Sequence, residues 1–307
     1  MNIALTGSNG FIGSNLIEFL EKNKKMNLIY INRSSENNNL RANYYSFEDF
    51  FNNKIKLNID IIIHLASPNF EYEKEFILRK GITELTKMII EKLPYYNCKK
   101  FIYFSSCKVY GESSSNIESY NEESYLNPMT DYAKAKLEAE LLTKELCKKL
   151  RINYIIYRLP FVYGSGMKSN LGKIIKHLRG SLPFIIFSDK NKLKRSFLGI
   201  KNIELALQKN ISDESSFTNE VFNLSDSGPL SLSQLAKLYK IQGNSKSIII
   251  ALPLKFFYIL ARIPLMGKLV LKIFGSFEVD NNKIEKSYNF SLLSTEDLIF
   301  KKEDNLN

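Results

Sequence analysis

The feature that most constrains this chain is a glycine-rich turn directly behind a short apolar run at the N-terminus. Ile3, Ala4 and Leu5 form the apolar run, which is typical of a buried parallel strand. Three glycines follow at intervals of three residues, and a helical pattern then covers residues 14–21. A strand, a tight turn and a helix in this order predict the start of a parallel α/β unit.

Each glycine of this turn, Gly7, Gly10 and Gly13, has a mechanical role in such a unit. The first permits the tight turn, the second lets a pyrophosphate approach the backbone, and the third packs the helix against the strand. The start of the helix also offers free N–H groups and the positive end of its dipole to a phosphate. The sequence therefore predicts a dinucleotide site, rather than a turn that only reverses the chain.

Composition and charge argue against several classes of protein. With 307 residues, 44% hydrophobic and 24% charged, the chain suits a globular protein with one large α/β domain and a smaller one. The net charge of +11 is spread without an arginine-rich block, so it favours an anionic small molecule over a nucleic acid. Three cysteines without paired spacing and two distant histidines predict neither disulfides nor a metal site. The first strand leaves no room for a signal peptide, so we expect a cytoplasmic protein.

The spacing of the glycines narrows the prediction. With Thr6 before the turn and Phe11 and Ile12 inside it, the segment resembles the extended short-chain dehydrogenase/reductase family, also called the NAD-dependent epimerase/dehydratase family. Its members mostly act on nucleotide sugars. The resemblance covers nearly the whole chain and implies an α/β fold, with a Rossmann-like doubly wound parallel sheet that binds NAD(P), mainly residues 1–163. It also implies a smaller C-terminal substrate-binding cap, mainly residues 164–307, with some segments returning to the first domain.

The residues after the second predicted strand, 28–31, indicate which dinucleotide is bound. An acidic residue there would accept hydrogen bonds from both ribose hydroxyls and would repel a 2′-phosphate. This chain has Asn32 and Arg33 instead, so NADP(H) is favoured, with NAD(H) as the alternative. A further apolar run, residues 59–66, predicts a buried strand. We expect His64 within it to be packed and hydrogen-bonded rather than catalytic.

A tyrosine and a lysine four residues apart carry the predicted chemistry. Tyr132 and Lys136 stand at the start of a long helical pattern, so both side chains project from one face. A phenol has a pKa near 10 in water, so a nearby ammonium must stabilise the phenolate before Tyr132 can exchange protons near neutral pH. The pair follows a predicted strand, 101–104, that leads into two serines. With the glycine turn, this context favours catalysis over a solvated surface pair.

The resemblance assigns a role to each of these groups. It implies that Ser106 hydrogen-bonds the reacting oxygen, with Ser105 as the alternative. It implies that Tyr132 is the acid/base, and that Lys136 holds the nicotinamide ribose and lowers the pKa of the tyrosine. The expected cofactor contacts, from motif and resemblance together, are Gly7, Asn9, Gly10, Phe11, Ile12, Gly13, Asn32, Arg33, Leu65, Ala66, Ser67, Tyr132 and Lys136.

The residues after the catalytic serine exclude one reaction of the family. Family dehydratases carry Asp-Glu at this point, where this chain has Cys107 and Lys108, so we expect no dehydration. Cys107 also lacks a neighbouring histidine and is not expected to be a nucleophile. Two further positions resemble those that grip a nucleotide diphosphate in relatives. The candidate substrate-binding residues are therefore Ser106, Lys108, Asn170 and Arg195.

Residues 248–275 are rich in Leu, Ile and Phe, but lysines, an arginine and a proline interrupt them. Because a membrane span needs about twenty uninterrupted apolar residues, we expect a pair of amphipathic helices in the cap rather than a membrane span, with interfacial membrane contact as the alternative. The run Phe274–Asp280 resembles one branch of the family. Its members reduce UDP-linked 4-keto-6-deoxy-N-acetylhexosamines and form UDP-N-acetylquinovosamine.

These features together predict hydride transfer at C4 of a UDP-sugar. The preferred reaction is reduction of a UDP-4-keto-6-deoxy-N-acetylhexosamine for surface-polysaccharide precursors. A UDP-hexose 4-epimerase, acting on UDP-glucose or UDP-N-acetylglucosamine, is the first alternative, because the same three groups suit both reactions. A non-catalytic dinucleotide-sensing protein is the second. The resemblance also allows a homodimer through the helix that bears the tyrosine and lysine, where Leu137, Leu141 and Leu142 would suit packing.

Overall fold

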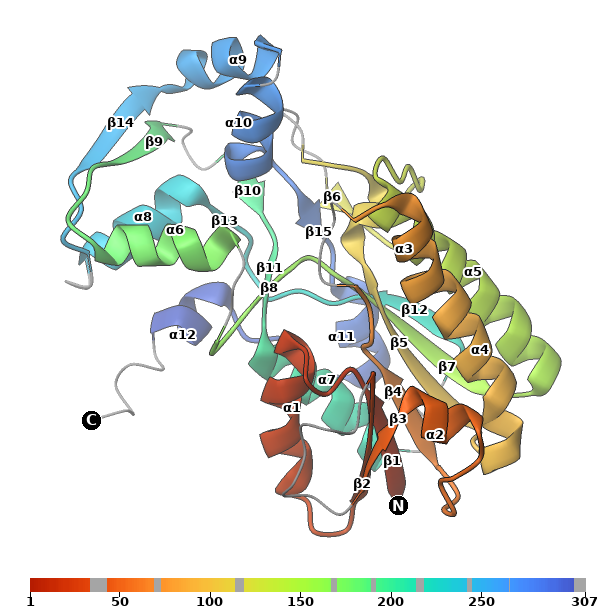
Figure 1. Ribbon diagram of the computed structural model, residues 1–307. Coiled ribbons are helices and arrows are strands. Elements are labelled where there is room, and N and C mark those ends of the chain that lie inside the picture. The colour runs from red at the N-terminus through yellow and green to blue at the C-terminus, as the bar shows by residue number, and fades with distance from the viewer. Residues whose placement is uncertain are drawn as a thin grey trace. The chain divides into compact units, whose positions relative to one another are not determined.

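The computed structural model describes residues 1–33, 43–68, 73–113, 119–166, 170–188, 192–213, 218–241, 245–264 and 266–300. The chain divides into two compact units (Figure 1). The first comprises Met1–Gly111, Tyr125–Leu159 and Ile203–Asn223, and the second comprises Glu112–Ser124, Pro160–Asn202 and Leu224–Asn307. The chain therefore leaves the first unit and returns to it twice before it ends in the second.

The first unit is built on a seven-stranded sheet in the order β12-β7-β5-β4-β1-β2-β3. Every pair of neighbouring strands in it runs parallel. Side chains such as Ile3, Ile29 and Ile62 are fully buried, as expected for a parallel sheet that is covered on both faces. The strands are β1 (Asn2–Thr6), β2 (Asn27–Asn32), β3 (Tyr44–Ser46), β4 (Ile61–His64), β5 (Lys100–Ser106), β7 (Asn153–Leu159) and β12 (Glu220–Asn223).

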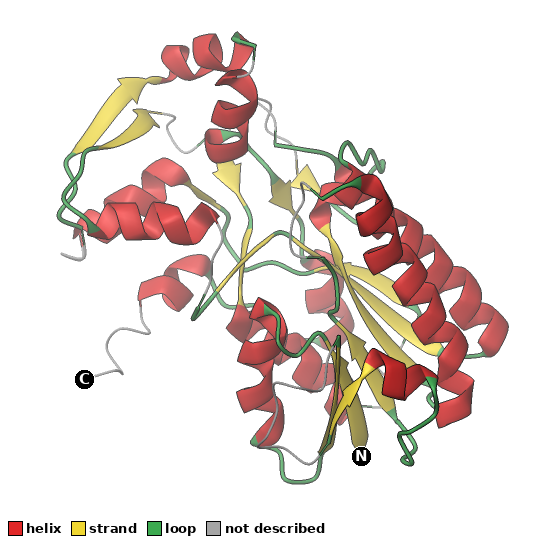
Figure 2. Ribbon diagram, viewed as in Figure 1, coloured by secondary structure: helices red, strands yellow, loops and turns green. Residues whose placement is uncertain are grey.

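Helices cover both faces of this sheet (Figures 1 and 2). On one face lie α1 (Phe11–Glu21) and α7 (Ile200–Ser212), and on the other lie α3 (Glu75–Arg79), α4 (Leu85–Lys92) and α5 (Asp131–Leu150). A short helix, α2 (Phe47–Phe51), follows β3, and a π-helical turn, Lys80–Glu84, joins α3 to α4. The predicted α/β fold with a doubly wound parallel sheet is confirmed.

The winding of the sheet reverses between β1 and β4. From β1 the order runs through β2 to β3 on one side and through β4 and β5 to β12 on the other. In open parallel sheets of this kind, ligands bind beyond the carboxyl ends of the strands at the point where the order reverses. The loops after β1 and β4 therefore mark where a site is expected in the first unit.

The second unit contains four two-stranded pairings, β10-β13, β11-β8, β14-β9 and β15-β6, and six helices that lie wholly within it, counted among the described residues. One apolar core is centred on Leu178 and Leu235, and a smaller one is centred on Phe257. The elements are β6 (Ser119–Tyr120), β8 (Phe161–Tyr163), α6 (Asn170–Arg179), β9 (Phe184–Ser188), β10 (Lys194–Arg195), β11 (Phe197–Gly199), β13 (Leu230–Ser231), α8 (Leu232–Ile241), β14 (Ile249–Pro253), α9 (Leu254–Arg262), α10 (Met266–Phe274), β15 (Glu278–Val279), α11 (Asn282–Tyr288) and α12 (Thr295–Phe300).

Candidate active site

The glycine turn lies at the carboxyl end of β1 and touches the loop 65–67 that follows β4. Gly7 has a φ of +73°, and a Cβ on it would lie 2.7 Å from the backbone nitrogen of Ala66. A Cβ on Gly13 would lie 2.7 Å from the Cα of Ser8. Side chains at either position would force the backbone apart, so both positions require glycine. The loop after β4 thus lies directly against the turn, as the predicted cofactor contacts require.

The start of α1 is open to an anion. Gly10 is the N-cap residue and carries no capping side chain, and the first turn of α1 contains no acidic residue. The N–H groups of Phe11, Ile12 and Gly13 precede the first intrahelical hydrogen bonds, and the helix dipole adds positive potential there. A bare helix start beside a turn without side chains fits the pyrophosphate of a dinucleotide.

Asn32, at the end of β2, holds the glycine turn from the side. Its Nδ2 donates to Ser8 Oγ at 2.8 Å, and its Oδ1 accepts a long hydrogen bond from the N–H of Asn9 at 3.4 Å. The side chain is buried, so its amide is engaged inside the protein. Arg33, the next residue, is exposed. Of these two residues, Arg33 is therefore the one whose side chain lies at the surface.

His64 is buried and hydrogen-bonded at both ring nitrogens. Thr86 donates its hydroxyl to the carbonyl oxygen of Ile82 at 2.6 Å, so it accepts from His64 Nε2–H at 3.1 Å. Thr6 then donates to Nδ1 at 2.7 Å, while its oxygen accepts from the N–H of Ala66 at 3.3 Å. Burial lowers the pKa of His64 to about 3, so the ring is neutral. The expectation that His64 is packed and hydrogen-bonded is confirmed, and its contacts fix the loop after β4.

The helix α5 begins where the predicted chemistry needs it. Thr130 is its N-cap residue, and the Thr130 Oγ1 accepts a hydrogen bond from the N–H of Ala133 at 3.2 Å. This cap fixes the first turn, which carries Tyr132 half-buried. The predicted helix start and the position of the tyrosine in it therefore have a local cause in the sequence.

Lys136 lies one turn further along α5, buried between the helix and β5. Its Nζ donates to the carbonyl oxygen of Phe104 at 2.9 Å. The same nitrogen lies 5.9 Å from the centroid of the Tyr132 ring and 5.0 Å from that of Tyr103. The structure thus brings the ammonium of Lys136 beside the phenol of Tyr132 in a site with little water, where electrostatic interactions are strong.

Burial lowers the pKa of Lys136 from 10.5 to about 7, although the charge of Glu140 acts in the opposite direction. Between these two values the unfolded chain binds more protons than the folded one, so Lys136 makes the folded state more stable as pH rises. We therefore expect the free energy of unfolding of a Lys136→Met variant, compared with that of the wild type, to be highest at pH 7 or below. That advantage should shrink towards pH 10, by up to about 1.4 kcal/mol per pH unit. Urea denaturation across this range measures the difference, and a difference that does not vary with pH would contradict the expectation.

The two serines at the end of β5 have different surroundings. Ser105 Oγ donates to Glu140 Oε1 at 2.5 Å inside the protein. Ser106 Oγ instead accepts from the N–H of Lys108 at 3.2 Å and caps the 3₁₀ turn Cys107–Tyr110. Lys108 itself is half-buried in that turn. Because Ser105 is committed to Glu140, Ser106 stays the candidate for a contact with a reacting oxygen.

A buried ion pair, which the sequence analysis missed, lies behind these groups. Arg158 at the end of β7 donates from Nη2 to Glu140 Oε2 at 2.7 Å and from Nε to Oε1 at 3.1 Å. Its Nη1 donates to the hydroxyl of Tyr110 at 2.9 Å, which in turn donates to Asn223 Oδ1 at 2.7 Å. Burial alone would lower the pKa of Arg158, but the hydrogen bonds to Glu140 hold it above its usual value. The sequence held one indication of this pair: Glu140 lies four residues after Lys136, and therefore on the same face of the predicted helix.

Two predicted substrate contacts belong to the second unit. Asn170 begins α6, and its side chain lies outside the described residues. Arg195 in β10 is buried, and its Nη1 and Nη2 donate to the carbonyl oxygens of Lys272 and Gly275 at 2.8 and 3.0 Å. The Nη2 also donates to Ser113 Oγ at 2.7 Å. The guanidinium thus caps the carboxyl end of α10, a contact that the sequence analysis did not anticipate.

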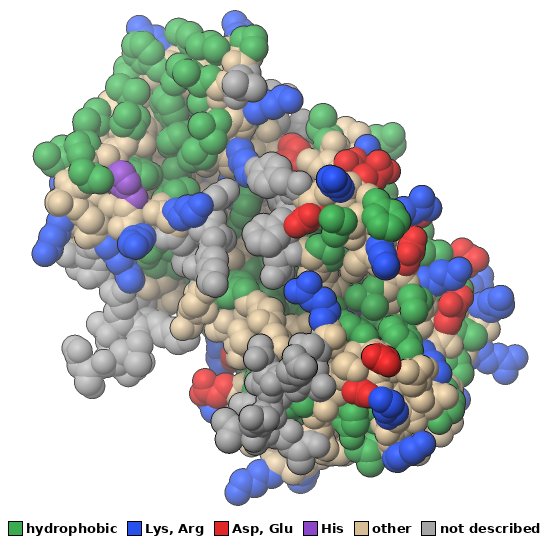
Figure 3. Space-filling model, viewed as in Figure 1, with side chains coloured by type: hydrophobic (Ala, Val, Ile, Leu, Met, Phe, Trp, Pro, Cys, Tyr) green, Lys and Arg blue, Asp and Glu red, His purple; other side chains and the backbone are tan. Residues whose placement is uncertain are grey.

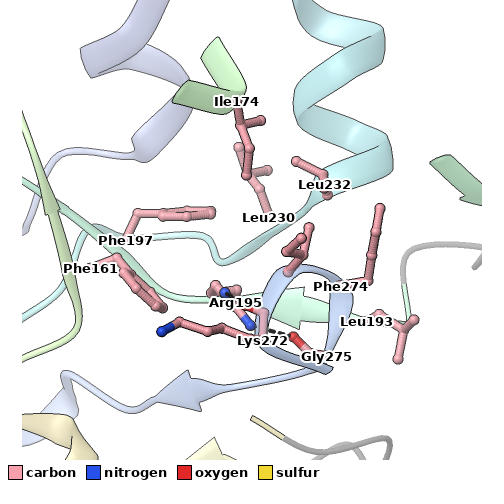
Figure 4. Close-up of a pocket in the computed structure, with 11 residues that line it drawn as sticks. Phe161, Ile174, Leu193, Arg195, Phe197, Leu230, Leu232, Lys272, Phe274 and Gly275 are labelled. Carbon is pink, nitrogen blue, oxygen red and sulfur yellow. Dashed lines mark hydrogen bonds between the residues drawn. The ribbon is translucent and has the colours of Figure 1, made fainter. Parts of the chain in front are cut away.

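Arg195 also lines a pocket in the second unit (Figure 4). Phe161 lies beside its guanidinium, 4.9 Å from the ring centroid. The Nε of Arg195 is buried without a hydrogen-bond partner among the described residues. Apart from Arg195 and Lys272 the wall is mainly apolar, with Ile174, Leu193, Phe197, Leu230, Leu232, Ile273 and Phe274. Most of the donors of this guanidinium are therefore engaged by the protein, and Nε is the nitrogen without a hydrogen bond among the described residues.

Other reactive groups are few in the part of the chain that the structure describes. No cluster of three His, Cys, Asp or Glu side chains there could hold a metal ion. Cys98, Cys107 and Cys147 are buried and form no disulfide, and burial raises the pKa of Cys98 and Cys147 to about 12. Neither of these two thiols therefore has the thiolate character that a nucleophile needs.

Comparison with known proteins adds a family and several relatives. A family model described as the NAD dependent epimerase/dehydratase family matches residues 3–224. A UDP-glucose 4-epimerase from Vibrio cholerae is 25% identical over 91% of this chain and 87% of its own length. A dTDP-D-glucose 4,6-dehydratase from Dictyostelium discoideum is 32% identical over 53% of this chain and 44% of its own. The solved structure of UDP-glucuronic acid 4-epimerase from Bacillus cereus in complex with NAD covers 97% of this chain and 95% of its own, with a TM-score of 0.74 and 20% identity.

Proposed function

This chain belongs to the NAD dependent epimerase/dehydratase family, and from that premise we propose that it is an NADPH-dependent nucleotide-sugar reductase. The proposed substrate is a UDP-linked 4-keto-6-deoxy-N-acetylhexosamine, and the product is the corresponding C4 alcohol, a precursor for surface polysaccharide. One hydride and one proton are added across the C4 carbonyl group. The observation that carries the proposal is the position of Lys136 Nζ beside the ring of Tyr132, in the same unit as the glycine turn and as Ser106 at the end of β5.

In this proposal the glycine turn and the start of α1 bind the pyrophosphate of the cofactor through backbone N–H groups. The bound cofactor supplies the hydride. Tyr132 donates its phenolic proton to the oxygen at C4, and Ser106 donates a hydrogen bond to the same oxygen. Lys136 stabilises the phenolate that remains, because its Nζ lies on the same side of α5 as Tyr132 and is shielded from water.

The preference for NADPH rests on Arg33, which is exposed at the end of β2. A guanidinium there can pair with a 2′-phosphate, whereas an acidic residue would repel it. We expect Arg33→Asp to weaken NADPH binding on the order of 10- to 100-fold, the effect of losing one hydrogen bond to a charged group, and to leave NADH binding much less affected. Fluorescence titration with each dinucleotide measures this. Lys24→Asp, which makes the same charge change at an exposed site of the first unit, is the control. Equal losses for NADPH and NADH would contradict the assignment.

A UDP-hexose 4-epimerase is the second candidate, favoured by the Vibrio cholerae relative, which is a UDP-glucose 4-epimerase. The same three side chains would then remove and return a proton at the C4 oxygen. An epimerase keeps its NAD through the cycle, whereas a reductase must exchange its cofactor. An epimerase is therefore expected to copurify with bound NAD and to need no added dinucleotide. We do not propose dehydration, because Cys107 and Lys108 stand where dehydratases carry Asp-Glu.

The test of the proposed reaction follows the loss of NADPH absorbance. Purified chain is mixed with UDP-2-acetamido-2,6-dideoxy-4-ketohexose, against controls without sugar and with NADH. The proposal expects NADPH to be consumed in proportion to the sugar, and consumed faster than NADH. A folded chain that binds NADPH but consumes none would overturn it. Conversion of UDP-glucose or UDP-N-acetylglucosamine without added dinucleotide would establish the epimerase instead.

We also propose that the chain forms a homodimer through α4 and α5. These helices pack side by side in the first unit, and Met88 and Leu141 expose large apolar side chains on them. Exposed apolar side chains on neighbouring helices suit a helical interface between two copies. Sedimentation of wild type and Leu141→Glu distinguishes dimer from monomer.

A further inference from the structure

The hairpin formed by α9 and α10 carries large apolar side chains on its solvent side. On α9, Phe256 and Ile259 are three residues apart and are 42% and 55% exposed, and Ile263, directly after the helix, is 41% exposed. On α10, Met266 and Leu269 are 48% and 59% exposed. Residues with this spacing share one face of a helix, and a surface helix normally presents polar side chains there.

The neighbouring strands extend the same kind of surface. Ile185 of β9 and Ile250 of β14 are paired in register, so their side chains leave the same face of the two-stranded sheet. They are 48% and 43% exposed, and Ile248, two residues earlier, is 62% exposed. We call the combined surface the apolar cap face, with the members Leu182, Ile185, Ile248, Ile250, Phe256, Ile259, Ile263, Met266 and Leu269. Contiguous exposed apolar surface in a globular protein marks an interaction site.

The hairpin cannot turn these side chains inward, because its other side is already packed. Phe257 of α9 is fully buried and Val270 of α10 is 8% exposed, and both contact Phe187 and Leu193 in one core cluster. The rings of Phe257 and Phe187 meet edge to face, with their centroids 5.6 Å apart. Rotation of either helix would empty this core, so the apolar cap face is a fixed feature of the folded unit.

The segment that supplies most of this face, residues 227–277, carries charge of one sign only. Between residues 227 and 277 the sequence contains no Asp or Glu and seven basic residues. Of these, Lys255, Arg262 and Lys268 lie on the hairpin and are exposed. Figure 3 shows hydrophobic side chains gathered over β14, α9 and α10, with Lys and Arg at their margins. The seven basic residues are Lys237, Lys240, Lys246, Lys255, Arg262, Lys268 and Lys272.

We propose that the apolar cap face docks the protein on the surface of an anionic lipid bilayer. Its apolar side chains would enter the boundary between headgroups and acyl chains, while Lys255, Arg262 and Lys268 would meet the negative headgroups. None of the helices that the structure describes is long and apolar enough to cross a bilayer. The docking is therefore peripheral, with the hairpin lying along the interface. The sequence left interfacial membrane contact as the alternative, because it could not show how much of the apolar segment faces solvent.

A second copy of the chain fits this surface less well. A two-fold contact brings the same patch of both copies together, so the basic side chains of the hairpin would meet each other. No acidic residue between positions 227 and 277 is available to balance them, and like charges brought together oppose association. An anionic bilayer has the charge that this surface lacks.

Sedimentation of the full chain with lipid vesicles tests the proposal. The vesicles contain phosphatidylcholine alone or phosphatidylcholine with phosphatidylglycerol. We expect binding to the vesicles that contain phosphatidylglycerol, weakened by added salt, and little binding to phosphatidylcholine alone. Absence of binding to both, or equal binding to both, would overturn the proposal.

Two variants and two controls locate the contact. Each basic residue near an anionic surface contributes roughly fivefold to binding, so Lys255→Glu/Arg262→Glu/Lys268→Glu is expected to lose on the order of a hundredfold or more. Phe256→Ser/Ile259→Ser/Leu269→Ser is expected to lose binding to a similar extent. The matched controls change exposed residues of the first unit and should bind as the wild type does. They are Lys24→Glu/Lys25→Glu/Lys148→Glu and Leu57→Ser/Ile77→Ser/Tyr95→Ser.

Thermal unfolding and sedimentation velocity complete the test. Both cap variants should unfold at the temperature of the wild type, because they change exposed side chains only. If the serine variant converted a dimer into a monomer and left vesicle binding unchanged, a second copy would be the occupant and the bilayer proposal would be wrong. If the matched controls lost as much vesicle binding as the cap variants, the contact would not be at this surface.

Discussion

A Tyr132→Phe variant is expected to turn over about 10² to 10⁴ times more slowly than the wild type, with unchanged dinucleotide binding. The substitution removes the hydroxyl that donates the proton and keeps the half-buried ring. Lys136 keeps its hydrogen bond to the carbonyl oxygen of Phe104, so the site stays assembled. Steady-state kinetics with the active sugar give kcat and KM, and fluorescence titration gives the affinity for the dinucleotide.

The expected pattern is a loss in kcat with little change in KM, because the proton is transferred only in the transition state. Tyr95→Phe, which changes an exposed tyrosine outside the site, should retain wild-type turnover. Full turnover by Tyr132→Phe would remove Tyr132 from the role of proton donor. A parallel loss of dinucleotide binding would show instead that the hydroxyl of Tyr132 helps to hold the cofactor.

An Arg158→Met variant is expected to lose about 3–5 kcal/mol in the free energy of unfolding. Arg158 is 2% exposed and Glu140 is fully buried, so the change leaves a carboxylate inside the protein without its cationic partner. Tyr110 also loses the donor to its hydroxyl oxygen. Urea denaturation near neutral pH measures the loss, which is a large part of the stability of an ordinary domain.

The double variant Arg158→Met/Glu140→Leu separates the buried charge from the packing. Replacing both partners with apolar side chains removes the uncompensated charge and should recover most of the loss. Ser105 then loses its acceptor, so a deficit of about 1 kcal/mol is expected to remain. A double variant less stable than the single one would show that packing around these side chains, rather than charge, sets the effect.

The sequence predicted the sheet well because its buried strands are apolar and short. The expected strands at 28–31 and 101–104 lie within β2 and β5. The expected strand 59–66 is longer than β4, because the N–H of Ile59 donates instead to the carbonyl oxygen of Tyr96, outside the sheet. An apolar run shows that a segment is buried, but the hydrogen bonds to neighbouring strands decide where it ends.

The spacing of apolar residues showed which segments are helical, but it did not show where a helix is interrupted. The spacing of apolar residues over 73–93 predicts one continuous helix, but the π-helical turn Lys80–Glu84 interrupts it, which no pattern of apolar residues reveals. Ser231 stands just before a helical pattern that ends at residue 238 and is therefore a predicted N-cap, and the structure confirms it, since its Oγ accepts from the N–H of Gln234 at 3.1 Å. Caps depend on neighbours in the sequence and can be predicted from it.

Side chains whose partners are distant in the sequence were the hardest to interpret. Arg195 was expected to grip a diphosphate, yet its Nη atoms hold backbone carbonyl oxygens nearly eighty residues away, at Lys272 and Gly275. Asn32 was expected at the ribose, yet its amide is bonded to Ser8. A charged or amide group in a motif has several polar partners within reach, and only the folded chain selects among them.

The last strand of the sheet has a consequence for any attempt to divide the protein. β12 comes from residues 220–223 and pairs with β7, and α7, which covers one face of the sheet, ends at Ser212. A fragment that stopped at residue 163 would therefore expose the backbone of β7 as a free edge and uncover part of the sheet, which invites strand-to-strand aggregation. An exchange of the second unit between relatives must therefore replace three separate segments of the chain, because the two units alternate along the sequence. For the same reason, the dinucleotide-binding unit cannot be expressed as a single N-terminal fragment.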